Sequence, residues 1–109
     1  MPASLPTSSV FGRRLRAARR VAGLSQVELG ALLGMNEKSA SSRLSRYERG
    51  EREPDHETLA ALSNALGVPP AYFHAGSDVL AEVILLVARL PLDQQSDVLE
   101  LLRRHLACR

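Results

Sequence analysis

Four glycines divide the first two thirds of this chain into short segments. Gly23, Gly34, Gly50 and Gly67 stand 11, 16 and 17 residues apart. The segments that they separate carry apolar residues three or four positions apart, which is the spacing of one face of an α-helix. The alternating apolar and polar pattern that predicts strands is absent. Since glycine commonly ends a helix, the chain is expected to fold as a series of short helices.

Capping residues indicate where several of these helices begin. Ser9, Asn36 and Asp55 each precede an apolar-periodic segment, and Ser25 with Glu28 forms the S-x-x-E capping box. The expected helical segments are 10–22, 25–33, 36–49, 55–66, 68–73, 78–90 and 93–107. The predicted fold class is therefore all-α.

Length and composition agree with one compact domain. The chain has 109 residues, 45% of them hydrophobic but only 4% aromatic, and it has no tryptophan. Leucine, valine and alanine must then build the core, which favours helices over sheets. We expect a loose lead-in over 1–9, a compact bundle of about five helices over 10–74, and two further helices in 75–109.

Charge is unevenly spread along the chain. The net charge is only +2, but residues 1–53 hold ten lysines and arginines against five carboxylates, a balance of +5, and residues 54–109 hold four against seven, a balance of −3. Positive charge gathered in one half indicates binding to phosphates. The most apolar run, Val79 to Leu90, is too short and too charged to span a membrane. The first ten residues lack the basic and apolar regions of a signal peptide.

Metal-binding and catalytic patterns are missing. A lone cysteine, Cys108, fits a reducing compartment and no internal disulfide. The three histidines, His56, His74 and His105, are dispersed and share no metal-ligand spacing with carboxylates or cysteines. Neither a G-x-S-x-G elbow nor a phosphate-binding P-loop occurs. We therefore expect no enzyme activity, no metal and no cofactor.

The first and third segments carry few apolar residues for their length. In the first, an apolar face over Phe11, Leu15 and Ala18 leaves Arg13, Arg14, Arg16 and Arg20 pointing elsewhere. The third reads GMNEKSASSRLSRYERG, with one narrow stripe of Ala40, Leu44 and Tyr47. Such a helix is stable only when its stripe docks on neighbouring helices. Two helices joined by a tight glycine turn, the second presenting polar residues, form a helix-turn-helix arrangement.

Residues 10–74 resemble the DNA-binding domain of the Cro/CI-like, or XRE, family of helix-turn-helix regulators. The resemblance lies in three stretches in the correct order, which are GLSQVELGALLGM, LSRYERG and PDHETLAALSNALGVP. It implies double-stranded DNA as the partner and a homodimer on a pseudo-palindromic site, with half-sites about 34 Å apart. It also implies a transcriptional repressor of bacterial or phage origin that is cytoplasmic and nucleoid-associated when bound.

One departure from the family concerns the third helix. The span from Gly34 to Gly50 is 17 residues, whereas family members usually have about 13, and the difference is close to one helical turn of about 3.6 residues. We expect a recognition helix lengthened at its N-terminus, and a longer turn loop is the alternative. Gly30 stands where the family usually has alanine, and a small residue there would let the second and third helices cross closely.

Site residues follow from the face of the third helix and from the resemblance. Arginine can bond guanine bidentately in the major groove, and serine can bond base edges or phosphate. The expected base contacts are Lys38, Ser41, Ser42, Arg43, Ser45 and Arg46. The expected phosphate contacts are Ser25, Gln26, Arg49 and Arg52. The family's partly buried ion pair falls on Arg19 and Glu48, and its role would be structural.

The C-terminal helices leave two interpretations open. They complete the core of a monomer, or they form a dimer interface, which the almost wholly apolar 78–90 segment favours. Only 35 residues follow His74, so no separate ligand-binding domain is expected. Two alternative functions remain beside the DNA-binding regulator. One is an antitoxin-like protein that binds a small protein partner through these helices, and the other is a protein-interaction module with a degenerate DNA surface.

Overall fold

The computed structural model describes residues 9–108, and all regular structure in that range is helical. Except for Ser9, the predicted lead-in lies outside the described residues. The helices are α1 (Val10–Val21), α2 (Gln26–Leu32), α3 (Glu37–Glu48), α4 (His56–Leu66), α5 (Pro70–His74), α6 (Asp78–Ala88) and α7 (Leu92–Ala107). The all-α prediction is confirmed, and the helix boundaries lie close to those expected.

Local side-chain chemistry explains most of the helix starts. The side chains of Ser9, Asn36, Asp55 and Ser77 each accept a hydrogen bond from a backbone N–H in the first turn of the following helix. α4 ends at Gly67, which has φ +68°, a left-handed conformation that glycine adopts without strain. Residues close in sequence therefore set these boundaries, which is why they could be predicted.

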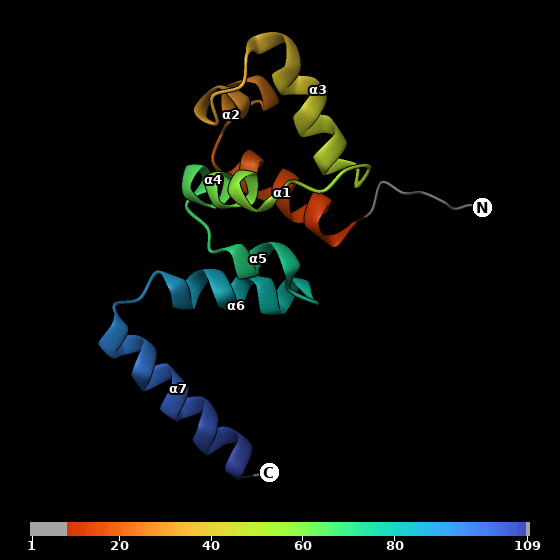
Figure 1. Ribbon diagram of the computed structural model, residues 1–109. Coiled ribbons are helices and arrows are strands. Elements are labelled where there is room, and N and C mark those ends of the chain that lie inside the picture. The colour runs from red at the N-terminus through yellow and green to blue at the C-terminus, as the bar shows by residue number, and fades with distance from the viewer. Residues whose placement is uncertain (1–8, 109) are drawn as a thin grey trace, which may run out of the picture.

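Helices α1 to α5 surround one core. α1 packs on α3 and α5, and α2 packs on α3, so the N-terminal helices form a compact body (Figure 1). The ring centroids of Phe11 in α1 and Phe73 in α5 lie 5.2 Å apart, so the first and the last of these five helices are in contact. The largest fully buried side chains are Phe73, Leu15, Leu29, Leu44 and Leu62.

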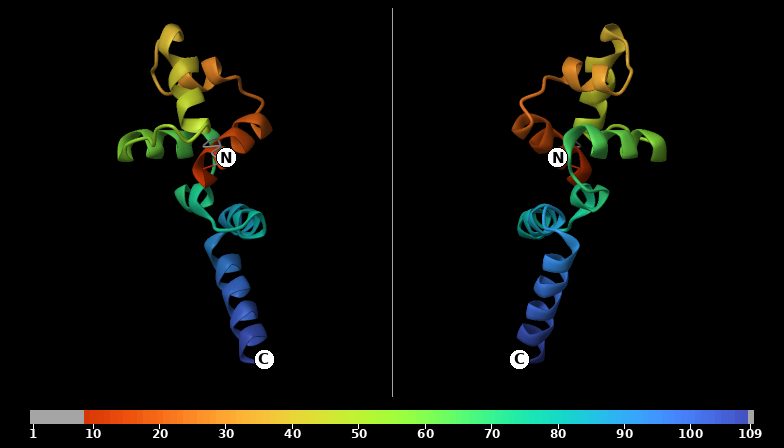
Figure 2. Two further views of the ribbon diagram at one scale, coloured as in Figure 1. Left: turned by 90° about the vertical axis from the view of Figure 1, so that its right-hand side faces the viewer. Right: turned by 90° about the vertical axis from the view of Figure 1, so that its left-hand side faces the viewer.

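The two C-terminal helices are arranged differently. α6 packs on α5, whereas α7 extends away from the rest of the molecule in all three views (Figures 1 and 2). The radius of gyration is 16.3 Å, and a compact domain of this length would have about 13 Å. The almost wholly apolar sequence of α6 predicts that it is covered on more than one face. Within the described chain only Ala81 of α6 is buried, and Val79 is 76% exposed.

Two other expectations from sequence were wrong. Arg14, predicted to point away from the apolar face of α1, is only 4% exposed, because α5 and the start of α6 cover it. Leu32 lies three positions after Leu29, a spacing that predicts one apolar face of α2, but Leu29 is fully buried and Leu32 is 62% exposed.

Candidate nucleic-acid interface

A tight connection joins α2 to α3. The Ser25 hydroxyl accepts from the N–H of Glu28, and the Glu28 carboxylate accepts from the N–H of Ser25 at 2.8 Å, so the predicted capping box is present. The connection covers only residues 33–36, with Gly34 at φ +81°. α3 then runs as one continuous helix from Glu37, so residues 37–40, the region of the expected extra turn, are helical.

The two helices cross with almost no space between them. A Cβ placed on Gly30 of α2 would overlap the Cβ of Ala40 in the first turns of α3. Both residues are buried, and the sulfur of Met35 lies 3.6 Å from the position that this Cβ would take. As expected, a residue without a side chain at position 30 lets α3 approach. The start of α3 is thereby held against α2.

A buried ion pair fixes the other end of α3. Arg19 of α1 donates from Nε to Glu48 Oε2 at 2.6 Å and from Nη2 to Glu48 Oε1 at 3.1 Å. Its Nη1 donates to the carbonyl of Leu24 at 3.0 Å. The side chains of Arg19 and Glu48 are only 12% and 5% exposed. The structure thus brings these two residues together in a bidentate arrangement that ties α1 to α3.

Gln26 extends this polar network to the exposed surface. Its Nε2 donates to Glu48 Oε1 at 3.2 Å, and its Oε1 accepts from the hydroxyl of Ser41 at 3.0 Å. The amide of Gln26 is therefore orientated from both sides, by a buried carboxylate and by an exposed serine of α3. Of these two atoms only Nε2 is a donor, so only Nε2 can bond a phosphate oxygen, while Oε1 keeps its contact with Ser41.

The polar face of α3 is open to solvent. Ser45 is partly buried, and the other predicted base-contacting residues, Lys38, Ser41, Ser42, Arg43 and Arg46, are exposed. Arg43 donates to the hydroxyl of Tyr47 at 3.2 Å, which directs its guanidinium along the helix. Arginines and short hydroxyl side chains on one exposed helix offer the donors that base edges accept.

The predicted phosphate-contacting residues flank this face. Ser25 and Gln26 begin α2, and Arg49 and Arg52 follow α3. Arg49 pairs with Glu51 at 2.9 Å, but both side chains are about half exposed, so the pair is weak and can open.

Two of the cavities that adjoin α3 have a volume of about 320 Å³ each. One is lined by Arg43, Arg46, Tyr47, Arg52, Glu53 and Asp55. The pKa of Asp55 is lowered, first by its hydrogen bonds with Thr58 and also by the nearby Arg43. The other is lined by Arg16, Arg19, Gln26, Ser45, Glu48 and Arg49. Arg16 was not among the expected contacts. It lines the same cavity as Gln26, and no pattern in the sequence indicates that these two residues lie close together.

No cluster of side chains suited to a metal ion occurs within residues 9–108, and no helix there is long and apolar enough to cross a membrane. The arrangement at α2 and α3 contains arginines, hydroxyls and one orientated amide, which are groups that bind phosphates and base edges.

Comparison with known proteins gives a consistent result. A sequence profile of the helix-turn-helix domain matches residues 10–74. The chain is similar to repressor protein C2 of Salmonella phage P22, with 36% identity over 69 residues, which cover 63% of this chain and 30% of that protein. It is also similar to the HTH-type transcriptional regulator ImmR of Bacillus subtilis (strain 168), with 38% identity over 69 residues, which cover 63% of this chain and 51% of ImmR.

A solved structure matches over a longer stretch. The crystal structure of transcriptional regulator BswR superposes with a TM-score of 0.82 at 42% identity, covering 89% of this chain and 96% of that one. The chain spans about a third to a half of the curated relatives named above.

Proposed function

Because this chain belongs to the helix-turn-helix family and is a DNA-binding transcriptional regulator, we propose that it binds a pseudo-palindromic operator as a homodimer, with α3 in the major groove. The family and its named relatives are transcriptional regulators, not enzymes, in agreement with the sequence-based expectation. We further propose that the protein is a repressor acting in the cytoplasm of a bacterium.

The exposed polar face of α3, held from both ends, is the observation that carries this proposal. Gly30 and Ala40 fix the start of α3, and Arg19 with Glu48 fixes its end. A helix held in this way can present arginines and serines to base edges without losing much conformational freedom on binding. We propose that Lys38, Ser41, Ser42, Arg43, Ser45 and Arg46 contact bases.

The phosphate contacts would come from the two sides of α3. Gln26 through its side-chain amide and Ser25 lie at the start of α2, where the helix dipole also favours an anion. The N–H of Ser25 would have to exchange its bond to the Glu28 carboxylate for one to a phosphate. Arg49 and Arg52 lie beyond the other end of the helix. We propose that these four residues set the register on the duplex, because phosphate contacts position a protein without reading its sequence.

The second copy would bind to α6 and α7. Most of the large hydrophobic side chains that the described chain exposes lie on these two helices. They are Val79, Leu80, Val83, Leu86, Leu92, Leu99, Leu101, Leu102 and Leu106. They are between 43% and 79% exposed, and an apolar surface of this extent on a soluble regulator marks an interface. Residues 75–109 would then serve as the dimerisation segment, and residues 10–74 as the DNA-binding domain.

Selection of binding sites from random duplex DNA tests the proposal. The selection is made at about 150 mM salt, where purely electrostatic binding is much weaker. We expect an enriched inverted repeat. Arg46→Ala should weaken binding to it by about 5- to 150-fold, which corresponds to the loss of about 1–3 kcal/mol for one bidentate base contact. Arg20→Ala, at an exposed position on α1, is the matched control. Salt-sensitive binding without enrichment would contradict the proposal.

The same apolar surface supports a second candidate, an antitoxin-like role in which a different small protein binds α6 and α7. α7 has no buried residue, and this exposure favours binding to a partner. It does not distinguish a second copy of the chain from a different small protein. The mass of the complex purified from its native cells distinguishes the two. A stoichiometric second polypeptide supports the antitoxin-like role, and a homodimer supports the operator-binding dimer.

A further inference from the structure

Within the described chain, the polar contacts that join the DNA-binding helices to α6 are concentrated at two adjacent arginines of α1. Arg14 donates from Nη2 to the carbonyl of Ala75 at 3.0 Å, and its Nη1 lies 3.2 Å from Asp78 Oδ1. Arg13 lies farther from the same carboxylate, at 3.8 Å. The hydrogen bonds and ion pairs found between residues 9–66 and 75–108 all involve these two arginines.

Arg14 is built into this position, whereas Arg13 is not. The Arg14 side chain is 5% exposed and that of Arg13 is 51% exposed. The guanidinium carbon of Arg14 lies 5.9 Å from the centre of the Tyr72 ring, and the α5–α6 connection closes over it. A buried guanidinium with two directed partners fixes their positions more firmly than a solvated one does.

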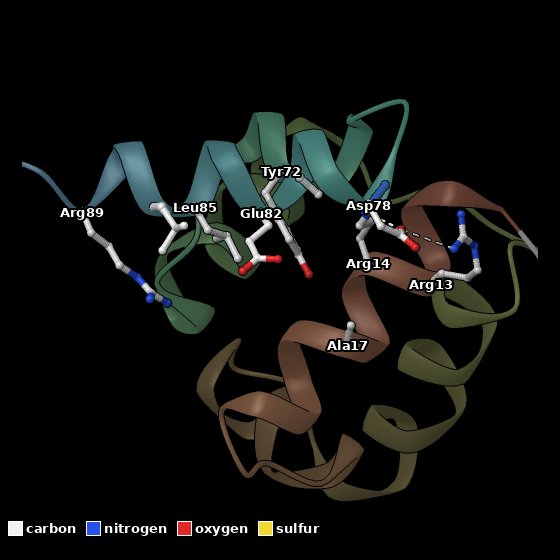
Figure 3. A pocket seen from close by; sticks show the side chains of 10 residues that line it. Arg13, Arg14, Ala17, Tyr72, Asp78, Glu82, Leu85 and Arg89 are labelled. Atoms are coloured by element: carbon white, nitrogen blue, oxygen red, sulfur yellow. Dashed lines mark ion pairs between the residues drawn. The ribbon is translucent and has the colours of Figure 1, made fainter. Parts of the chain in front are cut away.

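Beyond its first turn, α6 is separated from α1 by a cavity of about 440 Å³ (Figure 3). Ala17 of α1 lies on one side of the cavity, and Glu82, Leu85 and Arg89 of α6 lie on the other. Leu85 also packs against the core, as does Ala81. These apolar contacts and the packing of α6 on α5 hold α6 against the core and limit its angle to the range that side-chain packing allows. The directed contacts are at its N-terminus, at Arg14.

We propose that Arg14 is a positioning residue that sets the distance between the two half-sites which the dimer reads. This inference rests on the proposed function, since it requires the second copy to bind through α6 and α7. If α6 carries the dimer interface and α3 carries the base contacts, then the angle between α6 and α1 determines the separation of the two α3 helices. Arg14 fixes that angle without touching DNA.

A small rotation suffices for a measurable effect. The ten residue steps of α6 span about 15 Å at about 1.5 Å per residue. A rotation of about 13° at Arg14 would displace the far end of α6 by about 3.4 Å, which is about the rise of one base pair. Loss of the directed contacts should therefore make neighbouring spacings acceptable, while the bases read within each half-site stay the same.

Binding to a series of duplexes tests the inference. Each duplex carries the selected inverted repeat with the central spacer shortened or lengthened by one or two base pairs. For the wild-type protein we expect about tenfold weaker binding for each base pair of change, because half-site spacing must match the protein's geometry. For Arg14→Met we expect binding to weaken by less than about threefold for each base pair of change. Binding to a duplex with a single half-site should be the same for both proteins, which a general loss of structure would not allow.

Two further variants keep the test decisive if Arg14→Met does not fold. Asp78→Ala removes one of the two partners of Arg14 at a side chain that is 82% exposed, so the fold should survive. It should broaden the spacing preference to an intermediate degree. Arg13→Met is the matched control and should keep the wild-type preference.

The possible failures are distinguishable. If Asp78→Ala and every folded Arg14 variant keep the wild-type preference, the role of Arg14 is overturned and the proposed function stands. If the wild-type protein selects no inverted repeat, the proposed function fails and the role of Arg14 fails with it.

Discussion

Residues 9–74 and residues 75–108 distribute their apolar side chains in opposite ways. In the first region, leucines such as Leu15, Leu29 and Leu44 are fully buried. In the second region, α7 buries no residue and α6 buries only Ala81. The first region thus holds most of the core and offers a polar surface, and Ala75 and Ala81 of the second region also belong to that core. The second region leaves most of its large apolar side chains exposed.

Polar side chains show the reverse pattern. The first region buries an ion pair, Arg19 with Glu48, and holds Gln26 by two hydrogen bonds. In the second region, the one side-chain hydrogen bond found beyond the cap of α6 is that from Gln95 to the carbonyl of Leu90. Fixed polar groups suit sequence-specific recognition of DNA, and exposed leucines suit binding to a second copy. In the proposed dimer, the first region would therefore recognise DNA and the second region would bind the second copy.

The largest effect is expected at the buried ion pair. Arg19→Met leaves the Glu48 carboxylate buried without its charged partner, which should lower the free energy of unfolding by about 3–5 kcal/mol. Urea denaturation followed by circular dichroism measures this loss. Arg89→Met, at an exposed arginine of the second region, should change the stability by less than about 0.5 kcal/mol. Equal losses for the two variants would contradict the contrast between the regions.

Alanine substitutions at two glycines, one in each region, compare how closely the two regions are packed. In Gly30→Ala the new methyl group overlaps Ala40, and the overpacking should outweigh the better helix propensity, with a net loss of about 1–2 kcal/mol. A Cβ placed on Gly76 would meet no atom within 4 Å, so Gly76→Ala should be neutral or slightly stabilising. Thermal denaturation compares the two. Adding Ala40→Gly should restore part of the stability lost in Gly30→Ala, and an unchanged loss would show that the close crossing is not its cause.

Substitutions on α7 should affect assembly and leave the fold intact. Leu99→Glu with Leu102→Glu places two charges on the exposed apolar face, so the dimer should weaken by at least about tenfold, or about 1.4 kcal/mol. Sedimentation equilibrium over a range of protein concentrations measures this change. Glu100→Gln, on the same helix, is the control. A dimer of unchanged affinity would exclude this face of α7 from the interface.

The smallest effect concerns the caps of the two regions. The pKa of Asp55, which caps α4, is lowered, so its stabilising contribution is present above the ordinary value of 3.8 and is lost as the pH falls through the lower folded-state value. Ser77, which caps α6, does not titrate. Asp55→Ser should therefore reduce the loss of thermal stability between about pH 5 and pH 3. An identical acid dependence would show that Asp55 does not contribute to it.

Much of the first region could be predicted because its signals are local. The capping box of Ser25 and Glu28 spans four residues, and the stripe of Ala40, Leu44 and Tyr47 spans about two helical turns. These short patterns fix the helices and place the polar residues of α3 on the outside. The ion pair between Arg19 and Glu48, by contrast, came from the family resemblance.

The rest depends on contacts between distant residues, which no short pattern encodes. Arg14 binds the carbonyl of Ala75, 61 positions away, and in the sequence it looks like the other arginines of α1. The bridge from Ser41 to Gln26 likewise joins residues 15 positions apart. The sequence also could not predict what packs against the apolar faces of α6. Its apolar residues fit burial by the same chain as well as by a second copy.

The mass of the protein–operator complex tests the central claim most directly. Sedimentation equilibrium is measured with the selected duplex at about 150 mM salt, with protein in excess, so that non-specific binding is weak. We expect two copies of the wild-type protein per duplex. We expect the variant with Leu99→Glu and Leu102→Glu to bind as a single copy at the same concentration. One wild-type copy per duplex, or an operator without a second half-site, would contradict the division of the chain into a DNA-reading region and a dimerising region.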